Sequence, residues 1–167
     1  MRKILSLIIS LILLVGSATA STMNVSGRAG VYVSPDGTSS MMYGVSSSYN
    51  LTPNLSLRGA LETTTYTSNN VQTTYTPVTL DLIYSQDLAG IVNPYAGAGV
   101  SYNSITTGGN TSQTAGAQAE AGLRFNLGGF SAGVEYRVIV PDLNKTNVTS
   151  SSYNAYATGA FSQSFSF

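Results

Sequence analysis

Residues 115–140 read AGAQAEAGLRFNLGGFSAGVEYRVIV, and this stretch decides the fold. Apolar residues occupy every second position through residues 115–127, Gly128-Gly129 interrupts them, and the alternation resumes through residues 130–140. Successive side chains of a β-strand point to opposite faces, so a period of two is the strand pattern. The charged residues all fall on the parity opposite to the apolar ones: Glu120, Arg124, Glu135 and Arg137. The stretch therefore predicts an antiparallel hairpin with one apolar and one polar face.

The same alternation continues through the rest of the chain after the first twenty residues. Turn residues such as Pro35-Asp36-Gly37 and Thr52-Pro53-Asn54 close the segments. No segment has the i, i+3, i+4, i+7 apolar spacing of an amphipathic helix. We predict eight strands, at Met23–Ser34, Met41–Leu51, Leu55–Thr65, Thr73–Ser85, Pro94–Tyr102, Ala115–Leu127, Phe130–Val140 and Tyr153–Phe167. The face assignment is weakest in the fifth, because Tyr95 falls on its polar side.

The charges within these strands all fall on the polar faces and balance in sign. They are Arg28, Arg58, Glu62, Asp81, Glu120, Arg124, Glu135 and Arg137. Buried charges are expected to pair, so this balance predicts a structural ion-pair cluster in a closed polar interior. Glycines on the same faces would make room for the long charged side chains: Gly44, Gly97, Gly99, Gly122 and Gly133.

The orientation of the two faces separates a soluble barrel from a membrane barrel. A soluble outer face normally carries many charges, but only 8% of this chain is charged. Aromatic residues of the apolar face gather near the strand ends, as in the girdles at the two membrane interfaces. These are Tyr43, Tyr49, Tyr84, Tyr102, Phe125, Phe130, Tyr153 and Phe165. The connections after the odd-numbered strands are longer than most of the others. The pattern favours an apolar face turned outward to lipid.

We therefore predict an all-β fold, an eight-stranded antiparallel up-and-down transmembrane β-barrel. A sheet in lipid must close to satisfy its backbone groups, and the lumen of eight strands is narrow enough for side chains to fill it. We expect a plugged lumen and a monomer. The extracellular loops are expected near residues 35–40, 66–73, 103–114 and 141–150.

The first twenty residues have the three regions of a secretory signal peptide. Arg2 and Lys3 precede an apolar run from Ile4 to Val15, and Ala18-Thr19-Ala20 is a small-x-small cleavage site. The run is too short for a spanning helix, which needs roughly 20 residues. We predict a signal peptide at 1–20 and a single barrel domain at 21–167.

Two stretches and the last residue carry a family resemblance. Asn93–Val100 reads NPYAGAGV, Tyr49–Leu57 reads YNLTPNLSL, and the chain ends on Phe167. With the signal peptide and the eight strands, they resemble the small bacterial outer-membrane β-barrel proteins of the OmpA/OmpX and Opacity-like adhesin type. The resemblance implies a place in the outer membrane of a Gram-negative bacterium. It also implies a C-terminal signal read by the outer-membrane insertion machinery, formed by Phe161, Phe165 and Phe167, although the polar Gln163 departs from the ideal pattern.

The composition excludes several chemistries. The chain has no His and no Cys, so it has no Ser-His-Asp triad, no disulfide and no metal site built on those residues. Neutral net charge excludes a strongly basic nucleic-acid binder. The pairs Arg58/Glu62, Glu120/Arg124 and Glu135/Arg137 could serve as acid–base sites, but we favour structural ion pairs. We predict no cofactor and no enzymatic activity.

Three functions stay open at this stage. The first is a structural or adhesin-like surface role, with the outer-membrane lipid and lipopolysaccharide around the barrel and a host or surface ligand at the loops. The second is a narrow channel for small solutes, which requires an unfilled lumen. The third is a soluble lipocalin-like barrel for an apolar ligand, which requires the apolar face inside.

Overall fold

The computed structural model describes residues 23–88, 90–127, 130–144 and 152–161, the last range by its backbone course. The predicted signal peptide lies outside these residues. No helix in the described part of the chain is long and apolar enough to cross a membrane.

Eight β-strands make up the described structure. They are β1 (Met23–Val33), β2 (Ser39–Asn50), β3 (Leu55–Ser68), β4 (Val71–Ser85), β5 (Val92–Thr107), β6 (Asn110–Leu127), β7 (Phe130–Val140) and β8 (Ser152–Phe161). Each strand pairs antiparallel with the next, and the order closes because β8 also pairs with β1, from Val25↔Phe161 to Val33↔Tyr153. The predicted closed up-and-down barrel is confirmed.

The two faces alternate as the sequence predicts. Charged and polar side chains point into the lumen, whereas Val25, Leu61 and Val100 are each at least half exposed on the outside. Tyr95, which made the fifth strand uncertain, is 7% exposed and lies inside the barrel, so the assigned parity is correct. The soluble alternative requires the apolar face inside, and it is wrong.

The central four strands are longer than predicted. Residues 66–73 and 103–114 were expected to be loops, but most of them are paired strand, with tight turns at Asn69-Asn70 and Gly108-Gly109. Asn69 and Asn70 have positive φ angles of 50° and 62°, which asparagine tolerates better than most residues. The Thr and Tyr residues around these turns favour strands, so a polar stretch here continues as sheet.

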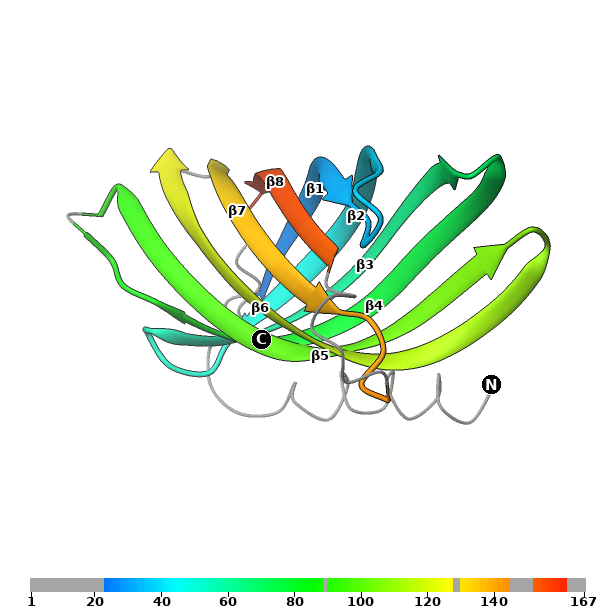
Figure 1. Cartoon of the computed structure of the whole chain (residues 1–167). Coiled ribbons are helices and arrows are strands. Elements are labelled where there is room, and N and C mark those ends of the chain that lie inside the picture. The colour runs from blue at the N-terminus through cyan, green and yellow to red at the C-terminus, as the bar shows by residue number, and fades with distance from the viewer. Residues whose placement is uncertain (1–22, 89, 128–129, 145–151, 162–167) are drawn as a thin grey trace.

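The β3–β6 wall, residues 63–76 and 103–114, is the extension that these strands form beyond the shorter β2 and β7. The pairings between the wall's two edge strands and the rest of the barrel end at Met42↔Thr64 and Ala117↔Val140. In Figure 1 the wall runs to the right, and its green and yellow-green hairpin tips lie beyond the other strands. The opposite end carries the connections β2–β3 and β4–β5. We call these the wall end and the turn end of the barrel.

A proline marks the base of the wall. Pro77 is buried in β4 and pairs with Asn103 of β5, but the β3–β4 register skips from Leu61↔Val78 to Thr64↔Tyr75. Proline cannot donate to a β-ladder, so it is found where pairing is interrupted. The interruption separates the apolar part of these strands from the hydroxyl-rich wall.

Candidate functional site

Three arginines and four carboxylates form one connected network in the middle of the lumen. Arg137 is fully buried at its centre. Its Nη1 atom lies 2.8 Å from Glu62 Oε2, and its Nε atom lies 3.1 Å from Glu120 Oε2. Its Nη2 atom lies 3.1 Å from Glu135 Oε1. One guanidinium therefore joins carboxylates from β3, β6 and β7.

Glu135 is the carboxylate that all three arginines contact. Besides Arg137, Arg28 of β1 donates to its Oε1 atom. Arg58 Nη1 of β3 lies 2.7 Å from its Oε2 atom, and the Tyr95 hydroxyl donates to the same oxygen at 2.8 Å. The buried charge is thus compensated by opposite charges and by a neutral donor, as a stable buried ion requires.

Asp81 extends the network toward β6. Arg58 Nη2 lies 3.7 Å from Asp81 Oδ2, and the Thr79 hydroxyl donates to that oxygen at 3.1 Å. The amide of Gln118 donates to the other carboxylate oxygen. Each oxygen of this fully buried acid therefore has a partner.

Inward-facing glycines lie opposite these side chains, as the sequence predicts. A Cβ atom on Gly44 would overlap Glu62, one on Gly97 would overlap Glu120, and one on Gly99 would overlap Asp81. A Cβ atom on Gly122 would overlap the ring of Tyr95. In the register these residues are direct cross-strand neighbours: Gly44↔Glu62, Gly97↔Glu120, Gly99↔Asp81 and Gly122↔Tyr95. The glycines provide the space that each buried acid or ring occupies.

Two of the three ion pairs predicted from the sequence, Arg58/Glu62 and Glu120/Arg124, do not form. Glu62 contacts Arg28 and Arg137, and Glu120 contacts Arg58 and Arg137. Residues four apart on one strand face lie about 13 Å apart along the strand, so their partners come from across the lumen. Among the predicted pairs only Glu135 and Arg137, two apart on β7, are in contact.

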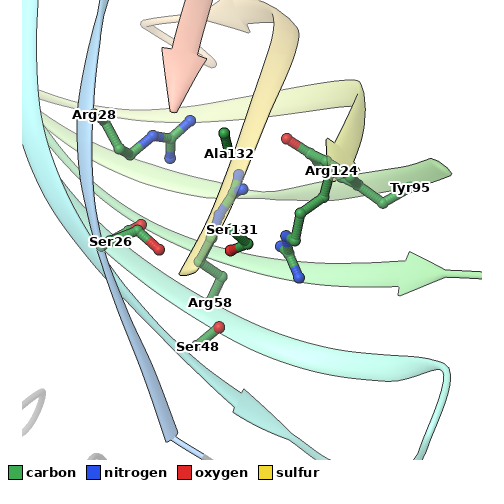
Figure 2. A pocket seen from close by; sticks show the side chains of 9 residues that line it. Ser26, Arg28, Ser48, Arg58, Tyr95, Arg124, Ser131 and Ala132 are labelled. Atoms are coloured by element: carbon green, nitrogen blue, oxygen red, sulfur yellow. The ribbon is translucent and has the colours of Figure 1, made fainter. Parts of the chain in front are cut away.

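Arg124 lies apart from this network, at the turn end of the lumen. Its guanidinium carbon lies 5.4 Å from the ring centroid of Tyr95, a cation–π distance. No carboxylate of the described residues lies within ion-pair distance of it. A small cavity of about 20 Å³ adjoins it, and the lining is Ser26, Arg28, Ser46, Ser48, Arg58, Tyr95, Arg124, Ser131 and Ala132. Figure 2 shows the guanidinium groups of Arg28, Arg58 and Arg124 turned toward this space.

An aromatic plug fills the wall end of the lumen. Tyr32, Met42 and Tyr75 are buried together, with Tyr66 and Ile105 packed against them. The ring centroid of Tyr32 lies 5.3 Å from that of Tyr75. The Tyr75 hydroxyl donates to Asn103 Oδ1 at 2.8 Å. This plug was not predicted from the sequence, although residue parity places Tyr32, Met42 and Tyr75 on the inward faces.

The wall itself carries hydroxyl groups on both sides. Threonine hydroxyls pair across strands on its outer face, between Thr63 and Thr76 and between Thr65 and Thr74, each at 3.1 Å. On the inner side the hydroxyls of Thr73 and Thr107 lie 3.0 Å apart. No charged residue occurs in the wall. From the cross-strand neighbours Leu61, Val78 and Tyr102 toward the turn end, the outer face of these strands is apolar.

The predicted aromatic girdle residues of the described part point outward. Tyr43 and Tyr102 lie toward the wall end, and their exposed fractions are 55% and 37%. At the turn end Tyr84 is about half exposed, and the other side chains are about a third exposed or partly buried: Phe125, Phe130 and Tyr49. The side chain of Tyr153 and the whole of Phe165 lie outside the described residues. So do Phe167 and the side chain of Phe161, whose backbone ends β8.

The described residues offer little to a metal ion or a hydrolytic reaction. No group of three metal-binding side chains occurs among them. The network acids are engaged by arginines, and the chain contains no His to act as a general base. The described lumen is therefore occupied by acids and arginines that contact one another.

Comparison with known proteins finds the fold in solved structures. No family model and no curated protein sequence matches the chain. Neisserial surface protein A is similar, with a TM-score of 0.70 and 17% identity over 87% of this chain and 98% of that one. The N-terminal β-barrel domain of Pseudomonas aeruginosa OprF gives a TM-score of 0.63 and 24% identity, covering 86% and 97% of the two chains.

An outer-membrane enzyme has the same architecture. PagL has a TM-score of 0.54 and 16% identity over 84% of this chain and 99% of its own. The fold is thus that of the small outer-membrane β-barrels, and it is compatible with both enzymatic and non-enzymatic members.

Proposed function

We propose that this protein is an integral outer-membrane β-barrel with a structural or surface-interaction role and no catalytic activity. The observation that carries the proposal is that the strands have two different parts along their length. The part toward the turn end encloses a filled lumen and has an apolar outer surface. Toward the wall end, β3–β6 continue as a wall with hydroxyl groups on both faces. Such an exposed apolar surface around a closed barrel is stable in lipid.

The same division sets the proposed orientation. Outer-membrane barrels make their longer excursions from the membrane on the extracellular side. Here the longer excursions are the projecting strand hairpins of β3–β4 and β5–β6, although each closes in a tight turn. We assign the wall to the cell exterior and the turn end to the periplasm. Lipid and the acyl chains of lipopolysaccharide then surround the apolar band, and the wall stands at the height of lipopolysaccharide sugars.

The chemistry of the wall favours an uncharged partner. Yersinia pestis Ail, another similar structure (TM-score 0.55, 14% identity), has been solved in complex with the heparin analogue sucrose octasulfate. The wall of the present chain has no Lys or Arg with which to bind sulfate groups. Its threonine hydroxyls instead suit a neutral, hydroxyl-rich surface such as a saccharide. Among the described residues of the wall, Val71 is the one exposed large apolar side chain, so tight protein binding through hot spots is not part of the proposal.

The lumen argues against a channel. The network and the aromatic plug fill it one above the other, and Arg137, Asp81 and Met42 are fully buried. The protein is therefore expected to pass no measurable current in planar bilayers. A single-channel current from the wild-type protein would contradict this part of the proposal.

Two measurements test location and closure. The protein should fractionate with outer membranes and require detergent for release. Unboiled protein in detergent should migrate differently from boiled protein, because a closed barrel resists unfolding by the detergent alone. Release into the aqueous phase without detergent would contradict the proposal.

Hairpin shortening tests the surface role. Removal of residues 65–68 and 71–74 would join Thr64 to Tyr75 through the existing Asn69-Asn70 turn, with parity preserved. Removal of residues 104–107 and 110–113 would do the same for Asn103 and Thr114 around Gly108-Gly109. Cells with either variant should bind saccharide-coated surfaces less than wild-type cells, with the folded gel band and outer-membrane level as controls. Unchanged binding by both folded variants would contradict the surface role.

The C-terminal phenylalanines are proposed to act as a signal for insertion into the outer membrane. Phe161, Phe165 and Phe167 would be read by the outer-membrane insertion machinery. Deletion of Phe167 should reduce the amount of folded barrel in the outer membrane without changing synthesis. An unchanged outer-membrane level would remove this role.

A further inference from the structure

The polar side chains that line the cavity at the turn end are all positive or neutral, and Ala132 is the apolar member of the lining. Three arginines come from β1, β3 and β6, and four serine hydroxyls lie among them. No Asp or Glu belongs to the lining, because the network acids lie on the far side of Arg28 and Arg58. We call this cavity and its opening the turn-end mouth. Its lining therefore holds guanidinium groups and no carboxylate, although Arg28 and Arg58 are also paired with network acids.

Arg124 is the group that sets this mouth apart. The arginines of the network are each held by two or more carboxylates, whereas Arg124 contacts the Tyr95 ring. Within the described residues its five N–H donors have no acceptor at hydrogen-bond distance. Arginine donors of this kind match the two oxygens of a carboxylate or the oxygens of a phosphate.

A buried donor of Arg58 gives independent support. Its Nε atom is buried and has no hydrogen-bond partner among the described residues. A buried donor without an acceptor is costly, so such a group often marks the place of a water or an ion. This atom belongs to a residue that lines the cavity, and Figure 2 shows its side chain reaching the space beside Ser131.

We propose that the turn-end mouth is a binding site for one small oxyanion, a carboxylate or phosphate group. Arg124 is the main group that binds the anion. Donors of Arg58 and Arg28 lie deeper in the lumen, and the hydroxyls of Ser48 and Ser131 donate further hydrogen bonds. The cavity of about 20 Å³ holds one water-sized group, so the anionic tip of a ligand enters and the rest stays in solvent. The ligand is either a free anion or the charged end of a larger periplasmic molecule.

Titration of the refolded full barrel in detergent micelles tests the site. Acetate and inorganic phosphate are added while the side-chain Nε–H signal of Arg124 is followed by NMR. The expected result is a saturable shift with acetate or phosphate and none with acetamide, which has the shape of acetate without its charge. Absence of saturation with both anions would overturn the proposal.

Variants assign the shift to the mouth. Arg124→Gln should weaken acetate binding at least about tenfold, read from backbone signals of residues 46–48 and 131. Arg124→Lys should retain part of it. If Arg124→Gln fails to give the folded gel band, Ser48→Ala with Ser131→Ala takes its place and should also weaken binding. Undiminished binding by the folded variants would overturn the site.

A second arm separates the two ligand sources. N-acetyl-alanyl-alanine, which ends in a free carboxylate, is compared with its C-terminal amide. Tighter binding than acetate by the free acid, with none by the amide, would identify the end of a larger molecule as the ligand. Equal affinity for the free acid and acetate would identify a free anion. Binding of the amide as strong as that of the acid would overturn oxyanion recognition.

Discussion

The middle of the lumen and the β3–β6 wall share strands but are held together in opposite ways. In the lumen, charged side chains from β1, β3, β4, β6 and β7 contact one another across the barrel and are almost completely buried. On the outer face of the wall, backbone ladders and threonine pairs connect neighbouring strands only, whereas its inward residues Tyr66, Tyr75 and Ile105 belong to the plug. Stability therefore resides in the lumen, whereas the outward positions of the wall can change at little cost.

The largest effect is expected from loss of the central guanidinium. Arg137→Gln leaves Glu62, Glu120 and Glu135 with fewer positive partners in a buried site. Breaking a buried pair costs about 3–5 kcal/mol, so the free energy of unfolding should fall by that amount. Urea unfolding in lipid vesicles measures it. A loss below about 1 kcal/mol, typical of surface ion pairs, would show that the network is solvated.

A methyl group opposite a buried acid should have the next largest effect. Gly99→Ala places a Cβ atom against the Asp81 carboxylate and the Leu80 carbonyl. Overpacking typically costs about 1–3 kcal/mol. Gly59→Ala is the matched control, because its Cβ would meet only an ordinary contact at 3.9 Å. Equal losses for the two variants would mean that space inside the barrel is not limiting.

The plug should respond more weakly to loss of one hydroxyl. Tyr75→Phe keeps the ring against Tyr32 but removes the hydrogen bond to Asn103. The expected loss is about 1 kcal/mol, and Asn103→Ser in the same background should add less than it does alone. Strict additivity of the two changes would exclude a shared interaction.

The wall should tolerate replacement of its threonines. Thr65→Val removes one hydroxyl of the outer pair with Thr74 and keeps a β-branched side chain. The free energy of unfolding should change by less than about 0.5 kcal/mol. A loss comparable to that of Arg137→Gln would contradict the division between lumen and wall.

The smallest effect is local and depends on pH. The Ser34 hydroxyl donates to Asp36 in the β1–β2 turn and holds the pKa of this exposed carboxyl well below its usual range. A lowered pKa in the folded state stabilises the turn above the ordinary aspartate pKa, and this contribution is lost as the pH falls toward the folded value. The carboxyl ¹³C signal of Asp36 should therefore titrate at lower pH in the folded barrel than in urea. Ser34→Ala should raise the midpoint, and an unchanged midpoint would remove the hydroxyl as its cause.

The sequence was sufficient for the barrel because alternation carries through every strand. It assigned the inward face even where Tyr95 weakened the pattern, and it placed the charged residues on that face. Strand ends could not be read in the same way, since Thr-rich stretches such as 63–67 are equally polar in a loop and in a two-faced sheet. The partners of Glu62 and Glu120 depend on how strands face one another across the lumen, which periodicity along one strand does not contain.

The plug and the turn-end mouth are two further features that could not be predicted from the sequence. Tyr32 and Met42 have the parity of inward residues. The prediction treated the inward faces as polar, so it did not place a cluster of large apolar side chains inside the barrel. Arg124 was placed in the balanced cluster by its charge, and only the three-dimensional arrangement separates it from the acids. Composition gives the sum of the charges inside the barrel and does not give their distribution along its axis.

The contact between Arg28 and Glu135 has a consequence for assembly. These residues belong to β1 and β7, the two neighbours of β8, so the ion pair reaches over the strand that closes the sheet. While the sheet is open, this one contact is missing, although Arg28 also contacts Glu62 and Glu135 also contacts Arg58 and Arg137. Once β8 pairs with both β1 and β7, the ion pair joins these two neighbours on the lumen side. The pair thus adds a side-chain contact across the closing strand to the backbone ladders on its two edges.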